Sequence, residues 1–273
     1  MQEGEIMSSK GLTLAVVAIF ATAVASAAAT TAAIYGFASP QPREQVAAPA
    51  TGDFGTRVHD YLVANPEVLL DVQAALQRKQ AEEQQQAAQA AIAENQDRIF
   101  QPEFDAVLGN PDGAITVVEF FDYNCGYCRR ALADMDEIIA DNDDVRFILK
   151  EIPVLGPESQ AAQRVSYAFF KVAPEKYPDF HRALMEAGNR ATDESARAVA
   201  SAFGVTSDQI DAAMAEFPPE AALQEHFALA SAVGVTGTPA YIVGDTMLHG
   251  AIGADRIQQV IDNIRDCGQG TCS

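Results

Sequence analysis

Apolar residues follow two spacings along the chain, and these spacings predict the order of helices and strands. Between Phe54 and Ile99 they recur every three or four residues, as in an amphipathic helix, and Asn65-Pro66 marks a new helix start within that run. Ala114–Phe121 and Val145–Ile152 are instead short and rich in β-branched and aromatic residues, as buried strands are. The sequence therefore predicts a helical segment followed by an α/β domain.

Helices dominate the later part of the pattern. A helix over Ala131–Ala140 joins the two predicted strands, so these strands should be parallel. Residues 157–233 should form a block of helices, because Gly and Pro separate successive apolar stretches there. Ala240–Val243 and Met247–His249 follow as a hairpin, and Ala254–Ile264 as a last helix. The predicted order is βαβ, a helical block, then ββα.

The N-terminus contains a long uncharged stretch. Residues 12–38 carry no charged side chain and follow Lys10. The stretch fits a signal peptide, with small residues suited to cleavage, or an uncleaved anchor, since a membrane-spanning helix needs about 20 residues. Both interpretations export the rest of the chain into a compartment that permits disulfides. We predict a signal peptide or anchor over residues 1–38 and a linker over 39–53.

The helical segment over residues 54–100 is too thin to form a core of its own, and isolated helices need packing to be stable. Its apolar stripe over Val58–Leu76 favours self-association, so we predict an oligomerisation stalk. The alternative, an arm folded back on the following domain, stays open. The following domain is predicted over residues 104–273, with its helical insertion at about 157–233.

Composition excludes some partners. Hydrophobic residues make up 48% of the 273 residues, which suits a globular protein. The formal net charge is −20, which disfavours nucleic acid as a partner, because phosphate binding needs clustered Lys and Arg. The histidines show no paired spacing, so we predict no histidine metal site. They are His59, His181, His226 and His249.

The 4 cysteines form two local pairs. Cys125 and Cys128 lie where a buried strand ends and a helix begins, so the helix dipole should lower the pKa of Cys125 and favour its thiolate. Cys128, one turn further, should be more buried and should resolve a mixed disulfide on Cys125. Cys267 and Cys272 flank a Gly-rich loop, which favours a structural disulfide, with auxiliary redox or metal binding as alternatives.

Glu119 lies on the predicted strand six residues before Cys125, and burial there would suit a proton shuttle to Cys128. The alternative is a solvated strand-end carboxylate. The cysteines themselves also have alternatives: half of a four-cysteine zinc site with Cys267 and Cys272, a purely structural disulfide, or copper(I) held by soft thiolates. The position at a helix start favours redox chemistry.

The cysteines lie in the motif Phe120-Phe121-Asp122-Tyr123-Asn124-Cys125-Gly126-Tyr127-Cys128. Taken with Thr238-Pro239, this motif resembles the DsbA-like thioredoxin superfamily, and within it the ScsC-type oligomeric periplasmic disulfide isomerases. The resemblance implies a thioredoxin fold with an inserted all-helical subdomain, preceded by an N-terminal helical stalk. It implies a cis Pro239 facing the cysteines, a Thr238 backbone aimed at a bound peptide, and Glu119 as the family's buried acid.

The resemblance also implies a function. A redox-active Cys125–Cys128 disulfide, without a further cofactor, would act on cysteine-containing exported proteins and be reset by a membrane redox partner. Several catalytic heads on a stalk, with a trimer favoured, suit isomerisation; oxidation of the DsbA type and copper(I) binding are the alternatives. The spacer Gly126-Tyr127 departs from the strongest oxidants of the family, whose dipeptide contains a His. The implied location is periplasmic, either soluble after cleavage or tethered by residues 12–38.

Overall fold

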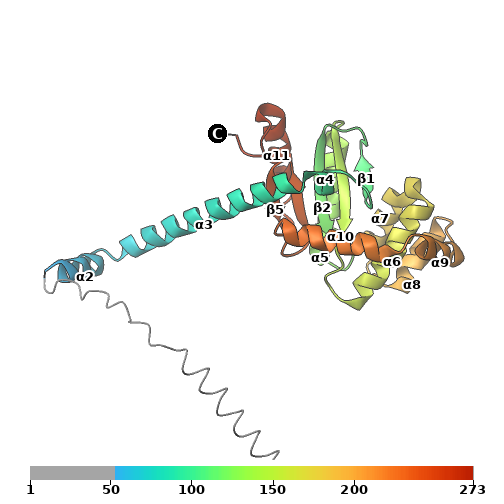
Figure 1. Cartoon of the computed structure of the whole chain (residues 1–273), viewed down its shortest axis with the longest axis horizontal. Coiled ribbons are helices and arrows are strands. Elements are labelled where there is room, and N and C mark those ends of the chain that lie inside the picture. The colour runs from blue at the N-terminus through green and yellow to red at the C-terminus, as the bar shows by residue number, and fades with distance from the viewer. Residues whose placement is uncertain (1–52, 273) are drawn as a thin grey trace, which may run out of the picture. The chain divides into compact units, whose positions relative to one another are not determined.

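The computed structural model describes residues 53–272 (Figure 1). The predicted signal peptide or anchor and almost all of the linker lie outside the described residues. The chain divides into two compact units, Met1–Ala74 and Ala75–Ser273. Within residues 53–272 no helix is both long and apolar enough to cross a bilayer.

The described part of the first unit is helical. It holds α2 (Phe54–Ala64) and the beginning of α3 (Glu67–Glu94), separated at the predicted Asn65-Pro66 break. α2 buries none of its residues, and its aromatic and aliphatic side chains Phe54, Val58 and Tyr61 are exposed. The apolar stripe found in the sequence therefore faces outward in the single chain.

The second unit is built on a five-stranded mixed sheet of order β1-β3-β2-β4-β5. β2 and β3 are parallel, as the βαβ pattern predicts, whereas β2–β4, β4–β5 and β1–β3 are antiparallel. The strands are β1 (Ala106–Gly109), β2 (Ile115–Phe121), β3 (Val145–Glu151), β4 (Ala240–Val243) and β5 (Thr246–His249). The sequence analysis does not predict β1, because its residues include a single β-branched side chain and no aromatic one.

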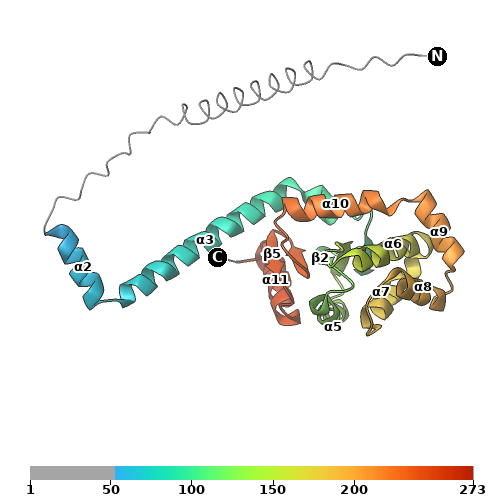
Figure 2. The same ribbon diagram turned by 90° about the horizontal axis from the view of Figure 1, so that it is seen from below.

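Helices cover both faces of the sheet (Figure 2). One face packs on α5 and α11 and the other on α10, α4 and the end of α3. The insertion forms a cluster of α6 to α9 beyond one end of the sheet (Figure 1). The helices are α4 (Gln96–Phe100), α5 (Gly126–Asp141), α6 (Pro157–Val172), η1 (Pro174–Lys176), α7 (Tyr177–Glu186), α8 (Asp193–Ala202), α9 (Ser207–Glu216), α10 (Pro219–Ala232) and α11 (Ala254–Cys267).

Strand alternation decides which side chains of β2 face which helices. Val117 and Phe121 join the core beneath α5 and α11, whereas Val118 and Phe120 join the opposite core with Ile92. Because side chains of a strand alternate with period two, Glu119 lies on the α5 face with Val117 and Phe121. The architecture is a thioredoxin fold with a helical insertion, and its β2–α5 junction carries the cysteine motif.

Candidate active site

Cys125 lies at the junction of β2 and α5. It is the N-cap residue of α5, its backbone N–H donates to the Asp122 carbonyl over 2.9 Å, and its side chain is 6% exposed. Its Sγ lies 3.2 Å from the carbonyl oxygen of Thr238. The first N–H groups of a helix have no partner within it and favour an anion at this position. Cys125 therefore lies between a helix start, which favours an anion, and the loop that carries Thr238.

The surroundings of Cys125 favour its ionised form. Hydrogen bonding by the Cys128 side chain is the largest influence and lowers the pKa of Cys125. Burial opposes it, but the Thr238 side chain and the backbone N–H groups of Cys128 and Tyr127 act in the same direction, so the pKa falls from 9.0 to about 5. At neutral pH Cys125 is a thiolate, the form that attacks disulfides.

Cys128 is the deeper of the two thiols. It is 1% exposed, and both cysteines are free thiols in this structure. Its pKa is raised, first by the hydrogen bond it gives to Cys125, then by burial and by the nearby Glu119 carboxylate. Cys125 therefore ionises first, and Cys128 keeps its proton while Cys125 carries the charge.

Glu119 is buried on the face of β2 that carries the cysteines. Its side chain is 4% exposed, and burial raises its pKa from 4.5 to about 8, partly opposed by a hydrogen bond from Tyr241 and reinforced by Asp134 and Cys125. The influence of Glu119 on the pKa of Cys128 shows that the carboxyl and this thiol are neighbours. A solvated strand-end carboxylate is therefore not what the structure contains.

Asp122 holds the turn between β2 and the cysteines. Its fully buried carboxylate accepts the backbone N–H of Asn124 at 2.8 Å and that of Leu155 at 2.9 Å. The first of these is an Asx turn, in which a side chain bonds the backbone two residues on. The sequence analysis missed this role, although an Asp at the end of a strand and just before a motif is a signal for it.

Asn124 ties the cysteine turn to the helical insertion. Its amide group bonds the backbone of Ala191 twice, accepting from the N–H at 2.7 Å and donating to the carbonyl at 2.9 Å. Arg129 adds two bonds, to the carbonyl oxygens of Tyr123 and Asn189. The Arg129 guanidinium therefore fixes this loop, and the causes that lower the pKa of Cys125 are other groups.

The remaining predicted residues surround the thiols. The Thr238–Pro239 peptide bond is cis, and the Pro239 carbonyl accepts the N–H of Gly250 at 2.8 Å. In the spacer, Gly126 starts α5, and Tyr127 is 61% exposed with the Arg130 guanidinium 4.4 Å from its ring centre. The facing loop and the spacer thus line the approach to Cys125.

Cys267 and Cys272 form a disulfide with each other. A four-cysteine zinc site would need both as free thiolates, so the structure overturns that alternative. The loop they close lies on the β4–β5 turn, where the N–H of Gly270 donates to Asp245 at 2.8 Å and a Cβ at Gly270 would collide with Thr246. Within residues 53–272, no three acidic, His or Cys side chains are grouped to hold a metal ion.

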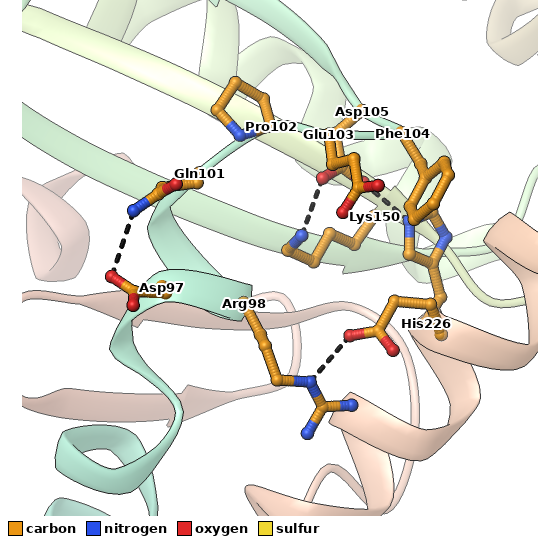
Figure 3. A pocket seen from close by; sticks show the side chains of 10 residues that line it. Asp97, Arg98, Gln101, Pro102, Glu103, Phe104, Asp105, Lys150 and His226 are labelled. Carbon is orange, nitrogen blue, oxygen red and sulfur yellow. Dashed lines mark hydrogen bonds and ion pairs between the residues drawn. The ribbon is translucent and has the colours of Figure 1, made fainter.

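A second polar site lies away from the cysteines. A cavity of about 490 Å³ is lined by Arg98, Glu225 and a buried group of Asp105, Lys150 and His226 (Figure 3). Lys150 Nζ lies 2.6 Å from Asp105 Oδ2, and His226 Nε2 lies 2.6 Å from Asp105 Oδ1. The sequence analysis missed this group, because its members come from three distant parts of the chain.

Two family descriptions match the sequence. Residues 116–262 match the DSBA-like thioredoxin domain, and residues 51–90 match the copper resistance protein ScsC N-terminal domain. The first match covers strands β2 to β5, the cysteine motif and the insertion, and begins after β1, whereas the second covers α2 and most of α3.

Individual relatives agree with these matches. Disulfide bond formation protein D of Bacillus subtilis is 34% identical over 84 residues, which cover 29% of this chain and only 38% of that protein. A thioredoxin-like oxidoreductase from Silicibacter pomeroyi is 36% identical with a TM-score of 0.60, over 63% of this chain and 99% of that one. A linker-deletion mutant of Proteus mirabilis ScsC is 25% identical with a TM-score of 0.59, over 81% and 99%.

Proposed function

The chain belongs to the DSBA-like thioredoxin domain family of thiol–disulfide oxidoreductases, and on that premise we propose that it exchanges disulfides in cysteine-containing exported proteins. The observation that carries the proposal is Cys125, a thiol with a pKa of about 5 at the start of α5, backed by the buried thiol Cys128. A cysteine with this pKa is ionised at neutral pH and needs no separate base for attack.

The first step is attack on a substrate disulfide. The Cys125 thiolate forms a bond to one substrate sulfur, the substrate S–S bond breaks, and the other substrate sulfur leaves as a thiolate. If that thiolate or another substrate cysteine then displaces Cys125, the substrate's disulfides are rearranged with no net redox change. Cys125 is regenerated as a thiolate, which completes an isomerisation.

The second outcome uses Cys128. Its thiol gives a proton to Glu119, its sulfur attacks Cys125, and the substrate leaves as a thiolate while Cys125–Cys128 becomes a disulfide. The substrate is reduced and the enzyme oxidised. We propose that a membrane redox partner then resets the pair, and that the Thr238 backbone beside the cis Pro239 pairs with the bound peptide.

The helical segment favours isomerisation over simple oxidation. The ScsC N-terminal match over residues 51–90 and the exposed apolar residues of α2 support a homo-oligomer, which we propose is a trimer of periplasmic catalytic domains. Contiguous exposed apolar surface on a soluble segment marks an interaction site. Several catalytic sites on one scaffold can hold a misfolded substrate while its disulfides exchange.

Oxidation is the second candidate, and one observation favours it. A low pKa stabilises the reduced form of a Cys-x-x-Cys pair and so makes its disulfide a stronger oxidant. The redox potential decides between the two. A potential near that of protein disulfide isomerase, about −180 mV, fits isomerisation, and one near about −120 mV fits oxidation.

Refolding of a scrambled multi-disulfide protein tests the proposal directly. Activity should be lost in Cys125→Ser, whereas Cys128→Ser should trap mixed disulfides that can be seen by mass spectrometry. Unchanged refolding by Cys125→Ser would refute the proposed chemistry. Deletion of residues 51–86, which leaves the core residues Ile92 and Ile99 in place, should lower the solution mass to that of a monomer. It should slow isomerisation more than it slows reduction of a small disulfide-bonded peptide. An unchanged mass would remove the stalk's role.

A further inference from the structure

Tyr241 lies directly opposite Glu119 in the sheet. β2 and β4 are antiparallel with Glu119 paired to Tyr241, so both side chains project from the same face. That face packs on α5, and Tyr241 belongs to the same core cluster as Cys125 and Cys128. Tyr241 is 1% exposed, so its hydroxyl is removed from bulk water and needs a partner among protein groups.

The groups around this pair leave few partners for the hydroxyl. Glu119 faces the thiols and Asp134 from α5, the ring of Tyr241 from β4, and the apolar Leu149 in register on β3. The pKa of Tyr241 is raised first by burial, then by the acidic groups of Glu119, Cys128 and Asp134, and also by hydrogen bonding to Glu119. A tyrosine hydroxyl beside a carboxylate donates its proton to the oxygen, since the carboxylate is acceptor only.

We propose that Tyr241 is a positioning residue for proton transfer in this enzyme: its hydroxyl donates to the Glu119 carboxylate and holds it ready to accept the proton of Cys128. The inference rests on the proposed function and adds a residue that the cysteine motif does not contain. In the step it serves, the Cys128 S–H bond breaks, the proton passes to Glu119, and the sulfur attacks Cys125 of the mixed disulfide. The substrate sulfur leaves with the electron pair of the broken S–S bond.

The electrostatics give the direction of the effect. Burial raises the pKa of Glu119 to about 8, and the hydrogen bond from Tyr241 opposes this rise. Without the hydroxyl the carboxylate would be less stable, so a smaller fraction of Glu119 would be able to take a proton at neutral pH. A phenylalanine keeps the ring and its packing but removes the donor, so it isolates this contribution.

The test follows release of a chromophoric peptide from a preformed mixed disulfide on Cys125, between pH 5 and 10. In Tyr241→Phe we expect the midpoint of the rate profile to move up by about one pH unit, because a hydrogen bond to a charged group is lost. Release at pH 7 should slow by about tenfold. Tyr177→Phe is the matched control: Tyr177 is also buried, but its hydroxyl bonds Ser166 of the insertion and Tyr123 of the cysteine motif, so the profile should not move.

A protein with fluorotyrosine at position 241 and the Cys128→Ser variant complete the test. Fluorotyrosine at position 241 is a stronger donor and should move the midpoint down, which tests the sign even if Tyr241→Phe folds poorly. An unmoved midpoint in Tyr241→Phe or with fluorotyrosine, or an equal shift in Tyr177→Phe, would overturn the role of Tyr241. Wild type and Cys128→Ser are measured alongside: failure of the proposed function would appear as release that does not need Cys128, independently of any change at Tyr241.

Discussion

Two buried carboxyl groups in the second unit have pKa values shifted in opposite directions. Glu119, on the α5 face of the sheet, has a pKa raised to about 8 by burial, and Asp134 and Cys125 push it further in that direction. Asp105, just before β1, is buried to a similar degree, with 4% of each residue exposed. Burial would raise the pKa of Asp105 too, but His226 and Lys150 outweigh it and lower the pKa.

The difference lies in the neighbours. Asp105 sits between the Lys150 ammonium and the His226 ring, each 2.6 Å away (Figure 3). His226 Nε2 and Asp105 Oδ1 lie close together but are not aligned as a hydrogen bond. The other ring nitrogen of His226, Nδ1, lies 3.0 Å from the Glu151 carbonyl oxygen. Glu119 has a tyrosine hydroxyl in place of cations. The pKa of a buried carboxyl is therefore lowered where basic groups lie beside it, as at Asp105, and raised where acidic groups do, as at Glu119.

Removing a partner of the buried Asp105 carboxylate should cause the largest change in the free energy of unfolding. Lys150→Met would leave the buried Asp105 carboxylate without its ammonium, and loss of one partner of a buried pair costs about 3–5 kcal/mol. Urea unfolding at pH 7 measures the change in the free energy of unfolding. Lys79→Met is the control, since Lys79 pairs with Glu83 on an exposed face of α3 and should change stability by less than about 0.5 kcal/mol. Equal losses in both variants would contradict the contrast.

Removing the charge of Glu119 should raise the free energy of unfolding, whereas breaking the Asp105 group lowers it. Its folded-state pKa of about 8 exceeds the ordinary 4.5, so the stability it contributes is fully present below pH 4.5 and is lost as pH rises to 8. Glu119→Gln should therefore be more stable than wild type at pH 7, by on the order of 3 kcal/mol at most. The gain should vanish near pH 4. Urea unfolding at both pH values measures it, and a variant less stable than wild type at pH 7 would count against an uncompensated carboxyl.

The smallest expected effect is the change in the pKa of Glu119 when the charge of Asp134 is removed. Asp134→Asn removes a negative charge that raises the pKa of Glu119, so this pKa should fall, by less than about one unit. Carbon-13 NMR titration of the glutamate carboxyls reports it. Asp136→Asn is the control on the same helix, because Asp136 pairs with Arg182 and does not act on Glu119. A shift in the control as large as that in Asp134→Asn would show that the effect is not specific.

The features predicted correctly from the sequence are those that depend on neighbouring residues. Cys125 at the start of α5, the more buried Cys128, and the βαβ unit are confirmed, because each depends on residues within a few positions of one another. A cis Pro239 also agrees with what the resemblance implied. Local signals predict an element and the thiol it presents.

The partners across the fold could not be predicted in the same way. Tyr241 meets Glu119 only through the β2–β4 register, and Lys150 and His226 meet Asp105 across separations of 45 and 121 residues. No spacing rule joins such positions, since they depend on how the sheet and α10 are assembled. The pKa of a buried carboxyl therefore depends on tertiary contacts, whereas the placement of Cys125 at the start of α5 depends mostly on local sequence.

The central claim is that Cys125 is a thiolate at neutral pH, and ultraviolet titration of the reduced protein at 240 nm tests it most directly. Thiolate absorbance should rise in one step with a midpoint near pH 5, well separated from any ionisation of Cys128. Cys125→Ser should lack that step. A midpoint near 9, the ordinary value of a cysteine, would contradict the account.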